Sequence, residues 1–233
     1  MPATPSELPR PRRRRRLLIA LASLAALAIA LPAADALARE RGESRLADRI
    51  AARHQDLRSA PQVEIGGYPF LLDAARGTHP EVRVTADGRT PDGRPVRAAV
   101  ELKEVVQGPG GYTAGAVDAR FTVPFDALAT GTGKNLRLSD AGDGQLRVER
   151  SAFGIAAVVT ARLELKDDTV TLQATKATLA GRPIDPANPL ITEALAGKRW
   201  ELPALPLGLR ASEVSVGPEG VTARARGERL TLS

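Results

Sequence analysis

The sequence predicts an α+β protein in which a helical N-terminal part precedes a long series of mostly antiparallel strands. Three observations lead to this class. A run of apolar residues follows a block of arginines, apolar residues recur with a helical period over 39–58, and the period falls from about 3.6 to 2 from Val63 onward. The 233 residues, 43% of them hydrophobic, are enough for one sizeable domain.

The first 16 residues are basic and are expected to stay on the cytoplasmic side of a membrane. Five consecutive arginines, Arg12–Arg16, precede the uninterrupted run of apolar and small residues Leu17–Leu31. Arginines resist crossing a bilayer whereas an apolar helix partitions into it. The residues after about 38 are therefore expected to be extracytoplasmic.

Two fates compete for residues 17–38. Ala36-Leu37-Ala38 fits the small-x-small pattern of a signal-peptidase site, which predicts a cleaved signal peptide. The same stretch also provides the roughly 20 residues that a transmembrane helix needs. An uncleaved single N-terminal span is favoured, because the Ala-rich continuation lets one helix run on out of the membrane.

An amphipathic helix is predicted over Arg39–Arg58. Leu46, Ile50 and Leu57 share one face of it, and charged residues occupy the rest. Pro61 is expected to end the helix, since a proline disfavours helical geometry in the residue before it.

The remainder reads as short strands separated by Gly, Pro and Asp turns. Pairs such as Leu146/Val148 and Val170/Leu172 alternate with polar residues and predict one buried face. Hairpin turns are expected at Asp167-Asp168 and at 217–220. The predicted strands are Glu81–Ala86, Arg97–Val106, Ala114–Val123, Gln145–Ala152, Ile155–Leu165, Thr169–Leu179, Leu209–Val216 and Val221–Gly227.

Two helices are predicted between these strands. Pro124–Thr130 is short. Asn188–Ala196 has stronger signals, because Asn188 suits the N-cap, Pro189 suits the first helical position and Gly197 can end the last turn.

Composition excludes several function classes. The net charge of +6 falls to +2 once residues 1–38 are set aside, so the folded domain lacks the basic excess of a nucleic-acid binder. The chain has no cysteine and only two histidines, His54 and His79, which excludes thiolate chemistry and a histidine-rich metal site. No cofactor is expected.

No catalytic motif stands out, and the protein is not expected to be an enzyme. The stretch 131–135 resembles a phosphate loop but lacks its first glycine and the Ser/Thr after lysine. Neither histidine lies in a segment like a catalytic loop. The low aromatic content of 3% disfavours a sugar-binding cleft, whereas acyl chains need only aliphatic walls.

Three segments together carry the character of a known family. They are Ile65-Gly66-Gly67-Tyr68-Pro69-Phe70-Leu71, the stretch Val123–Leu128, and Leu202-Pro203-Ala204-Leu205-Pro206-Leu207-Gly208-Leu209-Arg210. In this order, behind a basic and apolar leader, they make the chain resemble the LmeA-like phospholipid-binding family of actinobacterial cell envelopes over residues 40–233. Leu207 departs from the pattern, because relatives usually carry an aromatic there.

The resemblance implies a tubular lipid-binding fold, in which a curved, mostly antiparallel sheet wraps around a long amphipathic helix and leaves an apolar groove. It also implies non-enzymatic phospholipid binding at the outer face of the cytoplasmic membrane, in support of envelope lipid or lipoglycan assembly, with envelope biosynthesis enzymes as further partners. The expected organisation is a leader (1–16), an anchor or signal peptide (17–38) and a lipid-binding domain (39–233). Lipid contacts are predicted for Leu46, Ile50, Tyr68, Phe70, Leu205 and Leu207.

An alternative remains open. The domain could instead be a scaffold that docks envelope enzymes through a sheet edge or through Leu202–Arg210, without a ligand of its own. The same residues Gly66, Gly67, Pro69 and Gly208 could serve only to shape turns.

Overall fold

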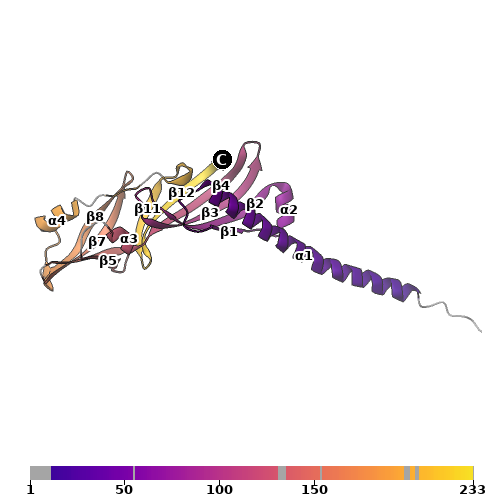
Figure 1. The fold of residues 1–233 in the computed structure, drawn as a ribbon, viewed down its shortest axis with the longest axis horizontal. Coiled ribbons are helices and arrows are strands. Elements are labelled where there is room, and N and C mark those ends of the chain that lie inside the picture. The colour runs from indigo at the N-terminus through magenta and orange to yellow at the C-terminus, as the bar shows by residue number, and fades with distance from the viewer. Residues whose placement is uncertain are drawn as a thin grey trace, which may run out of the picture.

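The protein is an α+β structure with 54% strand and 24% helix. The computed structural model describes residues 12–54, 56–130, 135–152, 154–196, 200–202 and 205–232, with side chains of the first helix described from Ala28 onward. The long first helix extends away from one end of the strands (Figure 1). The predicted α+β class, with mostly antiparallel strands after an N-terminal helix, is therefore confirmed.

One continuous helix, α1 (Arg12–Arg53), contains both the apolar run and the amphipathic segment, with Pro32 inside it. The side chains of 12–27, which include the first half of the predicted span 17–38, lie outside the described residues. Within the part of the chain that is described, no helix is both long and apolar enough to cross a membrane.

The helix ends at Arg53, before the predicted boundary at Arg58. The amide of Arg58 donates instead to the carbonyl of Asp87 over 2.8 Å, so this segment runs along the end of a neighbouring strand. The helix therefore ends well before Pro61, and this proline does not terminate it.

Two antiparallel sheets contain the strands. The first sheet has the order β1-β2-β3-β4-β12-β11 and the second has β10-β8-β7-β6-β5, with β9 paired to β8. The first consists of β1 (Gln62–Ile65), β2 (Thr78–Arg89), β3 (Pro95–Gly108), β4 (Gly111–Val123), β12 (Gly220–Leu232) and β11 (Ala211–Gly217). The second consists of β5 (Leu136–Asp140), β6 (Gln145–Ala152), β7 (Ile155–Lys166), β8 (Thr169–Leu179), β9 (Arg182–Ile184) and β10 (Trp200–Glu201).

Short helices connect these strands. They are α2 (Phe70–Arg76), α3 (Phe125–Ala129), α4 (Pro189–Ala196) and the 3-10 turn η1 (Pro206–Gly208). α3 and α4 confirm the two predicted helices to within a residue or two, and the predicted end of α4 at Gly197 lies outside the described residues. α2 was not predicted, nor were β1, β5, β9 and β10.

Both predicted hairpin turns are confirmed. Lys166 pairs with Thr169 across Asp167-Asp168, and both aspartates adopt positive φ, as a two-residue type I′ turn requires. Gly217 pairs with Gly220 across the second turn.

Two hydrophobic clusters fill the interior. The first cluster lies between α1, α2 and the first sheet, and includes Val63, Phe70, Val117 and Leu209. The second lies on the second sheet and is completed by residues of β11 and β12.

The amphipathic part of α1 packs on the first sheet through Ala38, Leu46, Ala47 and Ile50. Side chains of the first cluster occupy the space between the helix and this sheet. Among the described residues, the strands form two sheets and not the single curved sheet predicted around the helix.

Candidate functional site

The structure brings together four of the six residues predicted to contact lipid. Leu46, Ile50 and Leu205 are partly buried against the first cluster, and Phe70 is buried within it. Tyr68 and Leu207 instead lie exposed on the surface. Leu46, Ile50, Phe70 and Leu205 thus contribute to a hydrophobic core, and their contact with lipid stays a prediction.

The Ile65–Leu71 motif is held by α1. The carboxylate of Asp35, which is only 4% exposed, accepts hydrogen bonds from the amides of Phe70 at 3.0 Å and Leu71 at 2.8 Å. Asp35 thereby caps the N-terminus of α2, where Pro69 offers no side-chain cap. The guanidinium of Arg39, one turn further along α1, donates to the carbonyl of Gly67.

The two histidines show no catalytic arrangement. His79 stacks on Phe70 with ring centroids 5.9 Å apart, and its Nδ1 is buried without a hydrogen-bond partner among the described residues. His54 is exposed just beyond the end of α1. No group of three or more potential metal ligands occurs among the residues that the structure describes.

An extended apolar face belongs to the second sheet. Strand register places Leu138 opposite Val148 and Val148 opposite Val159, while Leu163 lies opposite Leu172. Because side chains alternate between faces along each strand, these residues share one side of the sheet. The same side carries Leu146, Ala161, Leu165, Val170, Ala174, Ala177 and Leu179.

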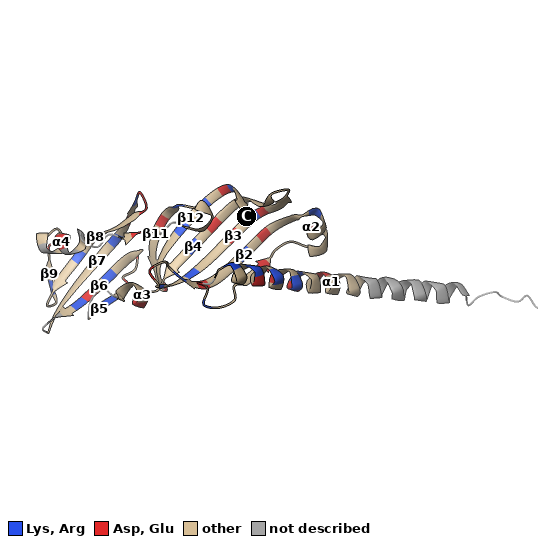
Figure 2. Cartoon of the chain, turned by 45° about the horizontal axis from the view of Figure 1, so that its top comes forward, with Lys and Arg blue, Asp and Glu red and all other residues tan. Residues whose placement is uncertain are grey.

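The opposite side of this sheet is polar. Arg147, Glu149, Arg162 and Glu164 occupy the alternate positions of β6 and β7, and Figure 2 shows charged residues along these strands. One face in water and one apolar face is the usual pattern of an antiparallel sheet that is covered on one side.

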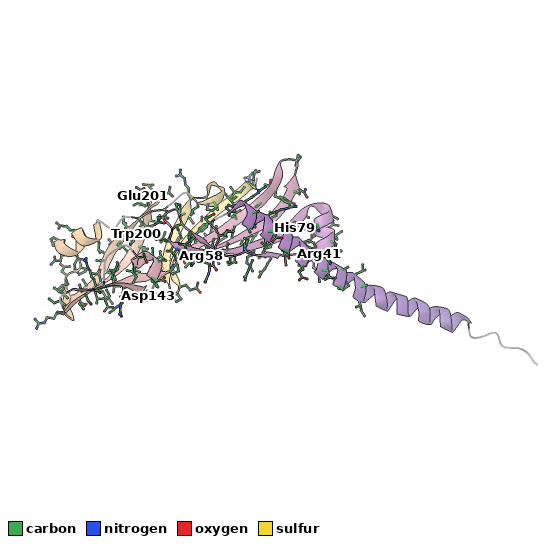
Figure 3. All side chains as sticks on the ribbon, viewed as in Figure 1. Arg41, Arg58, His79, Asp143, Trp200 and Glu201 are labelled. Carbon is green, nitrogen blue, oxygen red and sulfur yellow. The ribbon has the colours of Figure 1, made fainter. Side chains whose placement is uncertain are left out.

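The cover over the apolar face is incomplete. The second cluster holds Leu146, Leu163, Val170 and Val216 as buried members, but most of its described members are only partly buried. Phe125, Trp200 and Val214 border the face from α3, β10 and β11. Figure 3 places Trp200 in the half of the molecule away from Arg41 and His79.

Two arginines lie at one end of the apolar face. Register aligns Arg150, Ala157, Leu179 and Arg182 in one row across β6 to β9, and both arginines are exposed. Neither forms an ion pair with a described residue. Next to this row, Ile155 is 51% exposed. The surface thus passes from aliphatic to cationic within one row of the sheet.

Two surface hollows have a different character. One, of about 530 Å³, lies beside Arg58, Asp87 and Glu219, and contains Arg97 paired with Asp87 at 3.3 Å and with Glu219 at 3.2 Å. Arg97, Asp87 and Glu219 are therefore paired with one another in this hollow.

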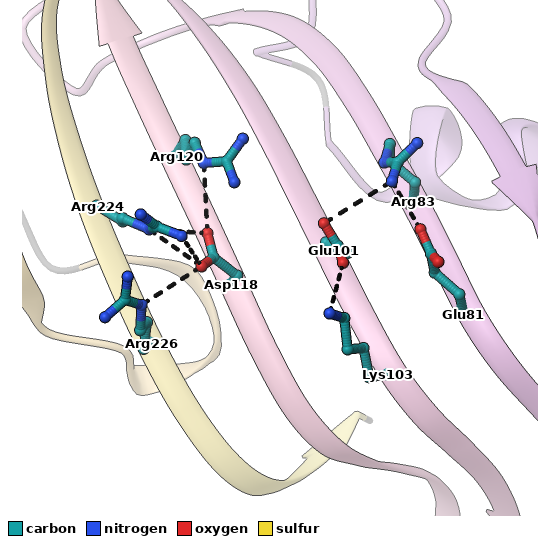
Figure 4. A network of polar contacts seen from close by, with 8 residues as sticks. All are labelled: Glu81, Arg83, Glu101, Lys103, Asp118, Arg120, Arg224 and Arg226. Carbon is teal, nitrogen blue, oxygen red and sulfur yellow. Dashed lines mark hydrogen bonds and ion pairs between the residues drawn. The ribbon is translucent and has the colours of Figure 1, made fainter.

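The second hollow, of about 490 Å³, overlies a charged network on the first sheet (Figure 4). Hydrogen bonds from the Arg224 guanidinium, as short as 2.5 Å, hold the pKa of Asp118 below its usual value. The Lys103 ammonium at 3.0 Å likewise lowers the pKa of Glu101. Opposite charges from β3, β4 and β12 are therefore paired within the sheet, which makes this network structural.

Part of the apolar face could be predicted from the sequence. The alternating pairs Leu146/Val148, Leu163/Leu165 and Val170/Leu172 were predicted to face one way, and the register confirms it. Leu136 and Leu138 alternate in the same manner and could have revealed β5. Trp200 carries no such signal, because β10 is only two residues long.

The comparisons with known proteins add one finding. A family model described as LmeA-like phospholipid-binding matches residues 33–226, which is most of the chain. No curated protein and no solved structure matches. The matched range begins just before Asp35, so the cap of α2 lies inside it.

Proposed function

The chain belongs to the LmeA-like phospholipid-binding family, and on that premise we propose that it binds membrane phospholipid without catalysis, with the acyl chains on the apolar face of the second sheet. The observation that carries this proposal is the partly uncovered aliphatic surface built by β5 to β8. Such walls suit hydrocarbon, which offers no polar group to recognise.

The face is long enough for an acyl chain. β8 has 11 residues, which at about 3.3 Å per residue extend roughly 36 Å. One leaflet of a bilayer core, which an acyl chain spans, is about 15 Å thick. Arg150 and Arg182 at the end of the face then suit a headgroup phosphate, because arginine forms charge-assisted hydrogen bonds with phosphate oxygens.

The energetics favour exchange with a membrane over permanent storage. Each methylene removed from water contributes about 0.8 kcal/mol, and a bilayer offers an acyl chain nearly the same environment. The net free energy of moving a chain between the two is then close to zero. A partly open face permits such movement.

The domain is proposed to act at the outer face of a cytoplasmic membrane, in envelope lipid or lipoglycan assembly. The order of arginines, apolar run and folded domain supports this orientation.

The test compares two double variants of the full chain. Val148→Gln/Leu172→Gln places polar groups on the apolar face, whereas Glu149→Gln/Thr171→Gln changes neighbouring residues on the opposite face. After incubation with phosphatidylglycerol vesicles and repurification, bound lipid is measured by native mass spectrometry. The first pair is expected to lose most of the lipid that the wild type carries, and the second to keep it.

A variant that keeps both positions apolar serves as the matched control. Val148→Met/Leu172→Met keeps the face apolar and is expected to retain lipid. Substituting Arg150→Gln/Arg182→Gln is expected to weaken binding without abolishing it. A wild-type protein that never carries phospholipid would refute the proposal and favour the scaffold hypothesis.

A further inference from the structure

We propose that α2 and the adjoining stretch of α1 form a membrane-seating surface that rests in the outer leaflet of a phospholipid bilayer. This surface is defined as Ile29, Leu31, Leu37, Tyr68, Leu71 and Leu72. The inference rests on the proposed membrane function, but it concerns a different surface from the lipid-binding face and has a separate test.

The surface exposes large apolar side chains where two helices meet. Tyr68, just before α2, is 71% exposed, and Leu72, within α2, is 44% exposed. Asp35 of α1 accepts hydrogen bonds from the first amides of α2, so the exposed leucines of α2 lie near the level of α1 at which Leu31 and Leu37 are exposed. Figure 1 shows α2 beside α1 where the helix leaves the sheet.

The one carboxylate in this part of α1 is hidden. Among residues 28–38, Asp35 is the only charged residue, and its side chain is turned onto the amides of Phe70 and Leu71. The exposed surface of this stretch is therefore entirely apolar or small. A charge left on it would oppose contact with lipid, and its burial against α2 removes that obstacle.

Each helix carries an exposed arginine one turn beyond an exposed leucine. Arg41 follows Leu37 on α1, and Arg76 follows Leu72 on α2, in both cases four residues later. Residues four apart share a helix face. A leucine among acyl chains with an arginine at the phosphates is the arrangement that suits a membrane interface, where long basic side chains reach the headgroups.

The length of the apolar stretch sets the level of the interface. Leu17–Ala38 comprises roughly 22 residues, or about 33 Å of helix, close to the ~30 Å thickness of a hydrocarbon core. A helix that starts from Arg16 on one side would reach the other interface near Arg39. This is the level at which Asp35 fixes α2.

The experiment uses the absence of cysteine from the chain. Leu72→Cys and the control Ser139→Cys, an exposed position on β5 of the second sheet, are each labelled with an environment-sensitive nitrobenzoxadiazole dye. The full-length proteins are reconstituted into phosphatidylglycerol/phosphatidylethanolamine vesicles, with and without phospholipid that carries a nitroxide near its headgroup.

The dye at position 72 is expected to shift its emission to the blue and to be quenched several-fold more by the nitroxide lipid than the dye at 139. Tyr68→Cys, on the loop before α2, should behave like Leu72→Cys. Water-like emission and equal quenching at 72 and 139 would overturn the inference.

Lipid binding in the same samples separates this inference from the proposed function. A protein that carries phospholipid but leaves position 72 in water would refute only the membrane-seating surface. A protein that does neither would refute both.

Discussion

Asp35 is the residue that most changes the interpretation of this chain. In the sequence it interrupts an otherwise apolar stretch and weakens the case for a membrane span. In the structure its carboxylate accepts two backbone hydrogen bonds from the start of α2 and is almost fully buried. Asp35 therefore takes part in the tertiary contacts of the folded domain.

Replacing this carboxylate should destabilise the protein. Asp35→Ala is expected to lower the free energy of unfolding by about 1–2 kcal/mol, because two amides at the start of α2 lose their acceptor. Urea unfolding of the full chain in mild detergent, followed by circular dichroism, measures it. Glu40→Ala, at an exposed position of the same helix, should stay within about 0.5 kcal/mol. Equal effects of the two substitutions would contradict the capping role.

At the scale of elements, local sequence patterns predicted the long strands and the two tight hairpins, whereas they did not predict α2. The long strands alternate apolar and polar residues along their own sequence. The start of α2 has no cap of its own, and its capping residue lies 35 positions upstream of Phe70. A helix that depends on a remote partner leaves no local pattern to detect.

The turn between β11 and β12 offers a matched pair of glycines. Gly220 has φ 144°, and a Cβ placed there would lie 2.1 Å from the carbonyl oxygen of Val123, whereas a Cβ at Gly217 meets open space. Gly220→Ala is expected to cost more than about 1 kcal/mol of unfolding free energy. Gly217→Ala should change it by less than about 0.5 kcal/mol.

Thermal unfolding of both glycine variants in the same detergent checks this expectation. The result would be contradicted if Gly217→Ala lowered the melting temperature as much as Gly220→Ala. The comparison is informative because the two glycines pair with each other across one turn.

For the whole molecule, the β11–β12 hairpin contributes residues to both hydrophobic clusters and so joins the two halves of the protein. Val214, Val216 and Val221 belong to the second cluster, while Ala225 and Leu230 further along β12 belong to the first. In the first half, the hydrophobic core packs against α1. The second leaves part of its apolar face uncovered.

This architecture predicts that the leader stays attached. Cleavage after Ala38 would remove Asp35 and leave the start of α2 without its cap. The protein recovered from membranes is therefore expected to retain residues 1–38, apart from the initiator methionine. Intact-mass spectrometry measures this directly, and a mature chain that begins at Arg39 would contradict it.

Local sequence patterns were enough to predict the α+β class, the alternating strands, the tight turns and membership of the family whose model matches residues 33–226. These features depend on residues close together in the chain, because periodicity and turn chemistry are local. Tertiary structure alone decided that the strands divide into two sheets, that Phe70 and Leu46 form a packed core, and that the uncovered aliphatic face belongs to β5–β8. Those outcomes depend on which strands pair and what covers them, and contacts between distant residues fix both.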